Sequence, residues 1–398
     1  MHPSLNTASR ILLFFILISQ QGYLPAAQLI KPEKVYRIVY EIQTDEWYRQ
    51  QAALWKKEID KNPKDASAWM NYYNANRYAN FDNIQAEERQ EKLNQIIEDM
   101  GKAIPDSYEY YILKFKTNSD LNNISLIEKA YALDPQRPDA YYDLLTWYAI
   151  KGETSRFNEF CEKLYRSKDI APWLMNYNYN VLKSTEPNAI LITNGDNDTY
   201  PAWLLQQVKN IRADVTILNI SLTSIQSYFE NTVKSKKIDL DYKSLQSRAQ
   251  QKGAANYPAA LMQEIAAELS EKYPQYPLYF ALTVYPDHIE AFKENLYTVG
   301  LAYRYNKKRL DNIALIRKNL EQNFILDYLK FDYAGDQYPG KRLAARINLN
   351  YISPMMLLAE HYSLSGDQEK ALRWKNFALS LAEAAGNKEA VEEINKKF

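Results

Sequence analysis

The sequence predicts a fold of the α plus α/β class, in which helical repeats flank a small three-layer unit built on a parallel sheet. Composition gives the first indication, because 33 tyrosines against 10 glycines in 398 residues favour helices packed through aromatic side chains. Turn residues recur at a step of 34 residues, from Ile104 to Pro138 and again to Pro172. The stretch Ala189–Ser221 then has the pattern strand, turn, helix, strand.

The N-terminus has the layout of a secretory signal peptide. Arg10 precedes the apolar run Ile11–Ser19, and small residues follow at Ala26 and Ala27. A membrane anchor is the alternative, but the run has about half of the roughly 20 apolar residues that a spanning helix needs. We therefore predict that residues 1–27 are a signal peptide and that the mature chain is exported, periplasmic or secreted, and does not span a membrane.

Charge and cysteine content exclude two further classes. The 49 basic and 49 acidic side chains balance, and no long basic run occurs, so binding to nucleic acid has no electrostatic support. Cys161 is the only cysteine, which excludes a disulfide within the chain. It falls within a helical pattern, so we expect a buried, inert thiol rather than a nucleophile.

Residues 28–186 are predicted to form about three degenerate repeats of paired helices. The 34-residue step is the period of the tetratricopeptide repeat (TPR). One repeat has consensus-type residues at several positions, although Phe157 stands where a small alanine is expected. A single helix pair cannot bury its apolar face, so neighbouring pairs must stack. Such a stack would present a concave, tyrosine-rich groove to a protein or peptide. The consensus-type residues are Tyr141, Leu144, Leu145, Tyr148 and Gly152.

Residues 187–306 are predicted to form a small Rossmann-like unit with parallel strands. Short apolar, β-branched runs indicate buried strands, and longer amphipathic stretches between them indicate helices. The expected strands are Ala189–Thr193, Val215–Ile220, Leu278–Val284 and Gly300–Tyr305. The expected helices are Ala202–Ile211, Ser224–Val233, Pro258–Tyr273 and Asp287–Asn295, with a loop and partial helix over Ser235–Asn256.

Residues 307–398 return to a helical, TPR-like pattern. Asp311–Leu329 is expected to be helical, and a long helix is expected to run from Leu343 towards Ser365. Gln368–Glu383 would form the returning helix, and the charged stretch Lys388–Lys397 suits a solvated cap on the stack.

The turn after the first predicted strand holds the best candidates for a site. Ligands of open α/β sheets bind beyond the carboxyl ends of the strands, where this turn lies. Two carboxylates there could bind a divalent cation through oxygen atoms or accept hydrogen bonds from sugar hydroxyls. The alternative is structural: Asp198 caps the following helix, while Asp196 and Asn197 form a local turn. The candidate ligand-binding residues are Asn194, Asp196, Asn197, Asp198 and Thr199, with Asp196 and Asp198 as the candidate metal ligands.

Known catalytic motifs are missing from the sequence. It has no G-x-G-x-x-G, Walker A, G-x-S-x-G, H-E-x-x-H or C-x-x-C pattern. His288 follows the third predicted strand and is the one candidate for acid–base catalysis at the same edge of the sheet. Apart from a divalent cation, no cofactor is expected.

Several stretches of the C-terminal half together resemble one known family. Ile192–Trp203, Ile211–Val215 and Gly300–Arg304 are similar to the soluble C-terminal part of a bacterial membrane family described as protein O-mannosyltransferase-like. The resemblance covers roughly residues 187–380. The catalytic work of that family would belong to its membrane-spanning half, which this sequence lacks. The resemblance therefore implies a shared periplasmic module rather than glycosyl transfer.

Two functional hypotheses follow from the sequence. The first is an exported, non-enzymatic adaptor that binds a protein or peptide through its helical repeats, with a ligand site at the acidic turn. The second is a glycan-directed or metal-assisted enzyme, or a glycan-binding protein, that uses Asp196, Asp198 and His288. Titration of the chain with divalent cations would separate the metal-dependent form of the second hypothesis from the first.

Overall fold

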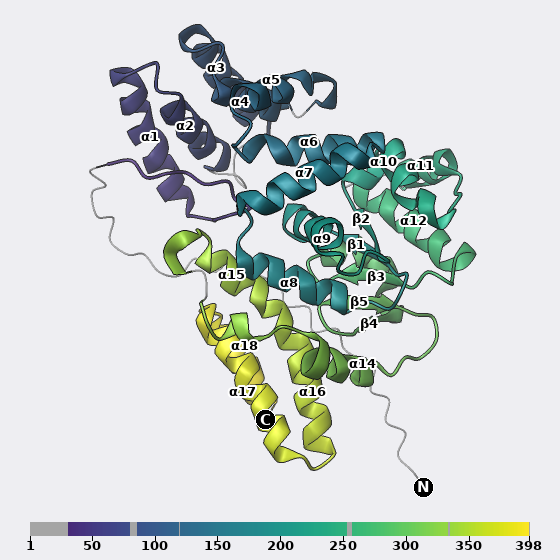
Figure 1. The fold of residues 1–398 in the computed structure, drawn as a ribbon. Helices are drawn as coiled ribbons and strands as arrows, with labels where there is room; N and C mark the ends of the chain where they lie inside the picture. The colour runs from purple at the N-terminus through teal and green to yellow at the C-terminus, as the bar shows by residue number, and fades with distance from the viewer. Residues whose placement is uncertain (1–30, 80–85, 119, 253–256, 333–334, 398) are drawn as a thin grey trace.

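The structure is a computed structural model that describes residues 31–79, 86–118, 120–252, 257–332 and 335–397. The predicted signal peptide, residues 1–27, lies outside the described residues. Helices occupy both ends of the molecule and a small sheet lies between them (Figure 1). In the described parts of the chain, no helix has both the length and the apolar character that crossing a bilayer requires.

Paired helices form the N-terminal part of the chain, as the sequence predicts. The helices α1 and α2 pack together, as do α4 and α5, and α6 and α7. A new helix begins at each proline-containing turn: α2, α4 and α6 start soon after Pro63, Pro105 and Pro138, and α8 starts at Pro172 itself. The helices are α1 (Asp45–Lys61), α2 (Ala66–Tyr78), α3 (Ala86–Ala103), α4 (Tyr108–Asn118), α5 (Ser125–Leu133), α6 (Asp139–Lys151), α7 (Thr154–Ser167) and α8 (Pro172–Lys183).

Phe157, which departs from the repeat consensus, has a partner that explains its size. It lies on α7 and meets Trp203 edge to face, with ring centroids 5.3 Å apart. Trp203 belongs to α9 (Asp196–Lys209), which packs against both α7 and α8. The α/β unit therefore continues directly from the last helix pair, and a large side chain fills the junction.

The sheet has five strands in the described chain, in the order β2-β1-β3-β5-β4. The strand β1 pairs parallel with both of its neighbours, with Ile190 opposite Thr216 of β2 and opposite Leu278 of β3. Every residue of β1, β2 and β3 is buried, which accounts for their continuous apolar runs. The strands are β1 (Ile190–Thr193), β2 (Thr216–Asn219), β3 (Leu278–Ala281), β4 (Leu296–Thr298) and β5 (Ala302–Tyr305).

The prediction of a parallel sheet is wrong for one edge, because β5 runs antiparallel to both β3 and β4. The sequence analysis missed β4, and three residues join it to β5. So short a connection can only form a hairpin, since a parallel crossover needs a dozen or more residues. Gly300 makes the turn at φ +145°, where a Cβ would lie 2.8 Å from Ser184 Oγ and from Phe324 Cζ. The sheet is therefore mixed rather than Rossmann-like.

Helices cover the sheet and connect its strands. The predicted helices over Ser224–Val233 and Pro258–Tyr273 are present as α10 and α12, and both pack against strands. The predicted loop Ser235–Asn256 contains one regular helix, α11. After α9, the helices of this part are α10 (Gln226–Val233), α11 (Tyr242–Gln251), α12 (Tyr257–Lys272) and α13 (Pro286–Ile289).

The C-terminal part is helical, but the long helix expected from Leu343 is divided. A 3₁₀ turn at Leu349–Tyr351 separates α15 from α16. Pro354 lies in the first turn of α16, where its missing N–H is not needed, so the sequence favours a new helix start there. The helices are α14 (Asn312–Lys318), α15 (Lys341–Asn348), α16 (Ile352–Leu364), α17 (Gln368–Ala384) and α18 (Lys388–Lys396).

One large hydrophobic cluster runs from α4 through the sheet to α18. Two smaller clusters lie beside it. One contains Ile59, Tyr73 and Met100 of α1 to α3, and the other joins Val35 to Tyr48 and other residues of α1 and α2. The segment before α1 therefore belongs to the packed structure.

Candidate functional site

The acidic turn after β1 forms the start of α9. The helix begins at Asp196, with Gly195 as its N-cap. The Asp198 carboxylate reaches back and accepts the backbone N–H of Asn194 and of Gly195, each at 2.7 Å. It also accepts the hydroxyl of Thr283 at 2.5 Å. This is the capping arrangement that satisfies otherwise unpaired amides at a helix start.

Burial governs the electrostatics of Asp198. The residue is 2% exposed. Burial raises the pKa of its carboxyl group, while the hydrogen bonds from Thr283, Asn194 and Gly195 act in the opposite direction. A cation bound here would have to replace these three donors. No group of three or more potential His, Cys, Asp or Glu ligands occurs among the residues that the structure describes.

Thr199 is also part of the interior. Its hydroxyl lies 2.8 Å from Thr193 Oγ1 and accepts a 3.0 Å hydrogen bond from Asn219 Nδ2. Thr199 therefore ties α9 to the ends of β1 and β2. With Asp198, it acts in the structure as a connection between the turn and the sheet.

Pro201 lies inside α9 and leaves a backbone carbonyl without its helical donor. Proline has no N–H, so the carbonyl of Asn197, four residues before, cannot receive the usual bond. Asn178 of α8 supplies the missing donor, with its Nδ2 2.8 Å from Asn197 O. Asn178 is fully buried, and this bond joins α8 to α9 beneath the turn.

Asp196 and Asn197 point the other way, towards the segment before α1. Arg37 Nη2 lies 3.3 Å from Asp196 Oδ2, and the Asp196 side chain is 44% exposed. Asn197 Nδ2 donates to the carbonyl of Val39 at 3.2 Å. Two of the five predicted ligand-binding residues thus contact a distant part of the same chain.

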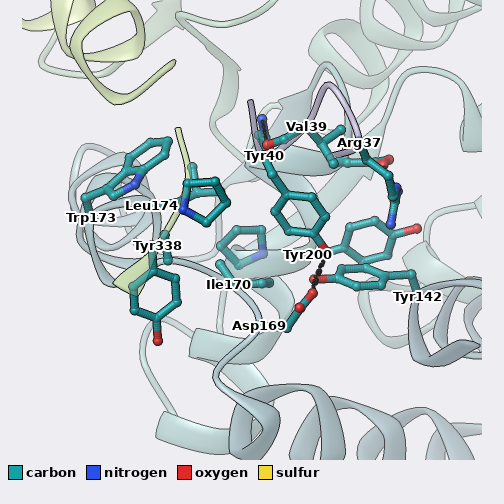
Figure 2. Close-up of a pocket in the computed structure, with 15 residues that line it drawn as sticks. Arg37, Val39, Tyr40, Tyr142, Asp169, Ile170, Trp173, Leu174, Tyr200 and Tyr338 are labelled. Carbon is teal, nitrogen blue, oxygen red and sulfur yellow. Dashed lines mark hydrogen bonds and ion pairs between the residues drawn. The ribbon is translucent and has the colours of Figure 1, made fainter. Parts of the chain in front are cut away.

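A small hollow opens beside these two residues (Figure 2). It lies between the segment before α1, the starts of α8 and α9, Tyr142 of α6 and the loop before α15. Its cavity volume is about 30 Å³, against the roughly 300–1,000 Å³ of pockets that bury small molecules. The lining residues are Arg37, Val39, Tyr40, Tyr142, Asp169, Ile170, Ala171, Trp173, Leu174, Asp196, Asn197, Tyr200, Pro201, Tyr338 and Pro339.

Two tyrosine hydroxyls meet one carboxylate at the floor of the hollow. Tyr142 donates to Asp169 Oδ2 at 2.7 Å, and Tyr40 donates to the same oxygen (Figure 2). Burial raises the pKa of Tyr142 well above its usual range, and the charges of Tyr40 and Asp169 raise it further. Burial likewise raises the pKa of Tyr40. Both hydroxyls therefore remain protonated and act as donors at neutral pH.

Arg37 lies against aromatic rings as well as beside Asp196. Its guanidinium carbon is 5.2 Å from the ring centroid of Tyr142 and 5.7 Å from that of Tyr40. Burial lowers the pKa of Arg37, but Tyr40 and Asp196 outweigh it, so its pKa is raised and the group stays charged. Tyr142 also meets Tyr200 edge to face at 5.0 Å. The site is thus a cation held between rings and one acid.

His288 lies on α13, after β3, and is not among the residues that line the hollow. Its ring contacts Tyr285 edge to face at 5.6 Å. Burial lowers the pKa of His288, and the charge of Asp287 partly compensates. The structure does not bring it together with Asp196 at this hollow.

The sequence analysis missed most of the residues that line the hollow. Arg37, Tyr40, Tyr142, Asp169 and Trp173 lie far from the acidic turn in sequence and match no motif. The abundance of tyrosine was the one available signal, and it does not indicate which tyrosines meet.

The residues that carry the family resemblance hold the architecture together. Arg212 donates to the carbonyls of Leu182 and Thr185 at 2.8 and 2.6 Å, which covers the end of α8. Asp214 pairs with Arg212 at 2.9 Å and accepts the N–H of Asn188. These groups fix the path from α8 into β1.

Comparison with known families gives one match. Residues 174–273 match the family described as TMEM260-associated domain 2. The matched stretch runs from α8 through the acidic turn and past the end of α12, about a quarter of the 398 residues. The comparison with curated proteins finds no match.

Fifteen chains of solved structures also match. One is the crystal structure of MamA, with 16% identity, a TM-score of 0.24, and coverage of 48% of this chain and 93% of that one. The Cut9–Hcn1 structure of the APC/C has 12% identity and a TM-score of 0.26, and the match covers 88% of this chain and 52% of that one. The human IFIT1 dimer with PPP-AAAA has 13% identity and a TM-score of 0.28, and the match covers 85% of this chain and 69% of that one. At these TM-scores the likeness carries no argument about this chain.

Proposed function

We propose that this chain is an exported, non-enzymatic adaptor that holds a protein or peptide partner on its helix pairs. The observation that carries the proposal is the hollow beside α9, which the segment before α1 lines on one side. Aromatic rings, one cation and two acids line it, which suits recognition of side chains.

The engagement of both acids supports a binding role over catalysis. Asp198 is committed to backbone amides, and Asp196 is paired with Arg37. A general acid or base needs access to the substrate proton, within about 3 Å in a plausible pose. Asp198 is 2% exposed and lacks that access, while the partly exposed Asp196 is engaged by its ion pair with Arg37.

We assign the α/β unit the role of a shared architectural module. The resemblance of residues 187–380 to the tail of the O-mannosyltransferase-like membrane family and the match over residues 174–273 support this assignment. Within that stretch, Arg212 and Asp214 make structural bonds. The module would therefore position the helix pairs, while glycosyl transfer belongs to the membrane part of that family.

Site-specific crosslinking tests the adaptor role. A photoreactive phenylalanine derivative replaces Trp173, which lines the hollow, in one chain, and Leu364, which is 84% exposed beyond it, in a control chain. We expect a discrete protein adduct in the exported fraction from position 173 and none from position 364. Equal adducts at both positions, or none, would contradict the proposal. N-terminal sequencing of the exported chain should give a start near residue 28.

Calorimetric titration with Ca²⁺, Mg²⁺ and Mn²⁺ tests the alternative, a metal-assisted function. We expect no binding heat from the wild type. The matched variant is Asp196→Asn, which keeps the shape of the side chain. Heat that appears with the wild type and disappears with the variant would replace the adaptor with the metal-dependent alternative.

A further inference from the structure

We propose that residues 33–40 are a peptide ligand held in cis, and that the groove they occupy receives the same kind of segment from a protein partner. This inference rests on the adaptor role proposed above and names the partner chemistry: a segment with a small aliphatic residue, an arginine two positions later and, at the end of a tight turn, a tyrosine three positions after that. Figure 1 shows the segment before α1 reaching across to the start of α8.

Three side-chain amides and one indole N–H of α1 and α2 bind the backbone of this segment. Gln51 Oε1 accepts the N–H of Glu33 at 2.8 Å, and Trp55 Nε1 donates to the Glu33 carbonyl at 2.8 Å. Asn71 Oδ1 accepts the N–H of Val35 at 2.7 Å, and Asn74 Nδ2 donates to its carbonyl at 3.2 Å.

These contacts differ from ordinary secondary structure. The described residues 32–37 form neither helix nor strand, and helix side chains satisfy the backbone groups of Glu33 and Val35. The segment then turns, with Tyr40 N–H donating to the Arg37 carbonyl at 2.9 Å. Carboxamides can donate and accept, which allows them to hold an extended backbone of any sequence. The helices α1 and α2 therefore provide a general hold on a peptide backbone.

Three side chains of the segment supply sequence preference. Val35 is 2% exposed and packs with Tyr48 and Tyr78 of the helices. Arg37 pairs with Asp196, and its guanidinium faces the rings described above. Tyr40 donates its hydroxyl to Asp169. Along the groove, an aliphatic contact for Val35, an acidic and aromatic contact for Arg37 and a carboxylate acceptor for Tyr40 thus follow in a fixed order.

The far side of the groove is shaped around the segment as well. Gly340, at φ +94°, lies so close that a Cβ there would come within 2.0 Å of the Tyr40 carbonyl oxygen. Any larger residue at 340 would push Tyr40 outward. The variant Gly340→Ala should therefore disfavour the cis segment and a peptide bound in its place alike.

Fluorescence anisotropy with a labelled peptide tests the proposal. The probe is a synthetic peptide with the sequence of residues 31–43, and the protein is the purified full chain. A tethered segment has an effective concentration in the millimolar range, so it competes strongly with a free peptide. We expect the Arg37→Ala chain to bind the peptide at least tenfold more tightly than the wild-type chain, and the Gly340→Ala chain, whose added Cβ also meets the peptide, to show no such gain.

Matched controls separate recognition from general loosening. A peptide with alanine at the positions of Arg37 and Tyr40 should bind at least tenfold more weakly. Adding Asn71→Ala to the Arg37→Ala chain should weaken binding of the unmodified peptide. Adding Leu372→Ala, a change at a 51% exposed position on α17, should leave that binding unchanged. Circular dichroism melting confirms that each chain remains folded.

Two outcomes would overturn the inference. One is an unchanged anisotropy in the Arg37→Ala chain while that chain still shows a cooperative melting transition. The other is light scattering that detects a dimer formed by segment exchange in the wild type, since the occupant would then be a second copy. Crosslinking from position 173 without peptide binding would leave the adaptor role intact, so the two proposals fail separately.

Discussion

Pro201 shows how one residue creates a requirement elsewhere in the chain. Because proline cannot donate to the Asn197 carbonyl, the buried amide of Asn178 does so at 2.8 Å. We expect Asn178→Ala to lower the free energy of unfolding by about 1–3 kcal/mol, the cost of leaving a buried polar group unsatisfied. Urea denaturation followed by circular dichroism measures the loss.

The double variant gives the control for that prediction. Pro201→Ala restores a backbone N–H at the position where a helix would bond the Asn197 carbonyl. Asn178→Ala in the Pro201→Ala background should therefore cost about 1 kcal/mol less than in the wild type, a coupling that a double-mutant cycle resolves. Additive losses would show that Asn178 stabilises the fold in another way.

The ion pair of Arg212 and Asp214 makes the free energy of unfolding depend on pH in the acidic range. The hydrogen bond from Arg212 lowers the pKa of Asp214 to about 2. A depressed folded-state pKa gives stability that is present above the unfolded value, near 3.9, and is lost as the pH falls through about 2. Since the Asp214 side chain is 35% exposed, solvent screening reduces its contribution to the free energy of unfolding to about 1 kcal/mol.

Asp214→Asn should remove that contribution. We expect the variant to be about 1 kcal/mol less stable at pH 7, with the difference shrinking below pH 4 and vanishing near pH 2. Denaturant unfolding across this pH range measures it. Glu162→Gln, which removes an exposed charge from a surface pair with Arg166, serves as control and should show no such convergence.

At the scale of elements, the pattern of apolar residues predicted where the strands lie but not all their directions. The runs that became β1, β2 and β3 are continuous and buried, and periodicity detects them. The strand β4 has only three residues, of which Leu296 alone is buried, so it has no pattern to detect. The antiparallel direction of β5 is set by its hairpin with β4, so it could not be predicted without β4.

The helix α7 offers a test through its cysteine. Cys161 is fully buried, as the sequence analysis expects, and burial raises the pKa of its thiol. We expect a thiol reagent to modify the native chain at least about a thousandfold more slowly than the unfolded chain, because modification needs opening of the core. Mass spectrometry over time measures the rate. Complete modification within minutes, without denaturant, would contradict this.

At the scale of the whole molecule, contiguous features of the site were predictable and its assembly was not. Asp196 and Asn197 stand in one motif, and both line the hollow. Their partners Arg37 and Val39 lie more than 150 positions earlier, and nothing local in the sequence brings them together. The other three predicted residues, Asn194, Asp198 and Thr199, have types that suit a ligand site and a helix cap equally well.

The separation of the hydrophobic clusters predicts unequal stability along the chain. Met100 and Leu261 are each no more than 1% exposed, but Met100 belongs to the small cluster of α1 to α4 and Leu261 to the large one. Either truncation to alanine should remove about 2–5 kcal/mol from its own cluster. Hydrogen exchange with mass spectrometry should therefore show Met100→Ala speeding exchange in α1 to α3 but leaving β1 protected, because small clusters open below the global unfolding energy. Leu261→Ala should speed exchange in β1 as well. If Met100→Ala exposed β1 equally, the two clusters would unfold as one unit and the helix pairs before α4 could not move independently of the sheet.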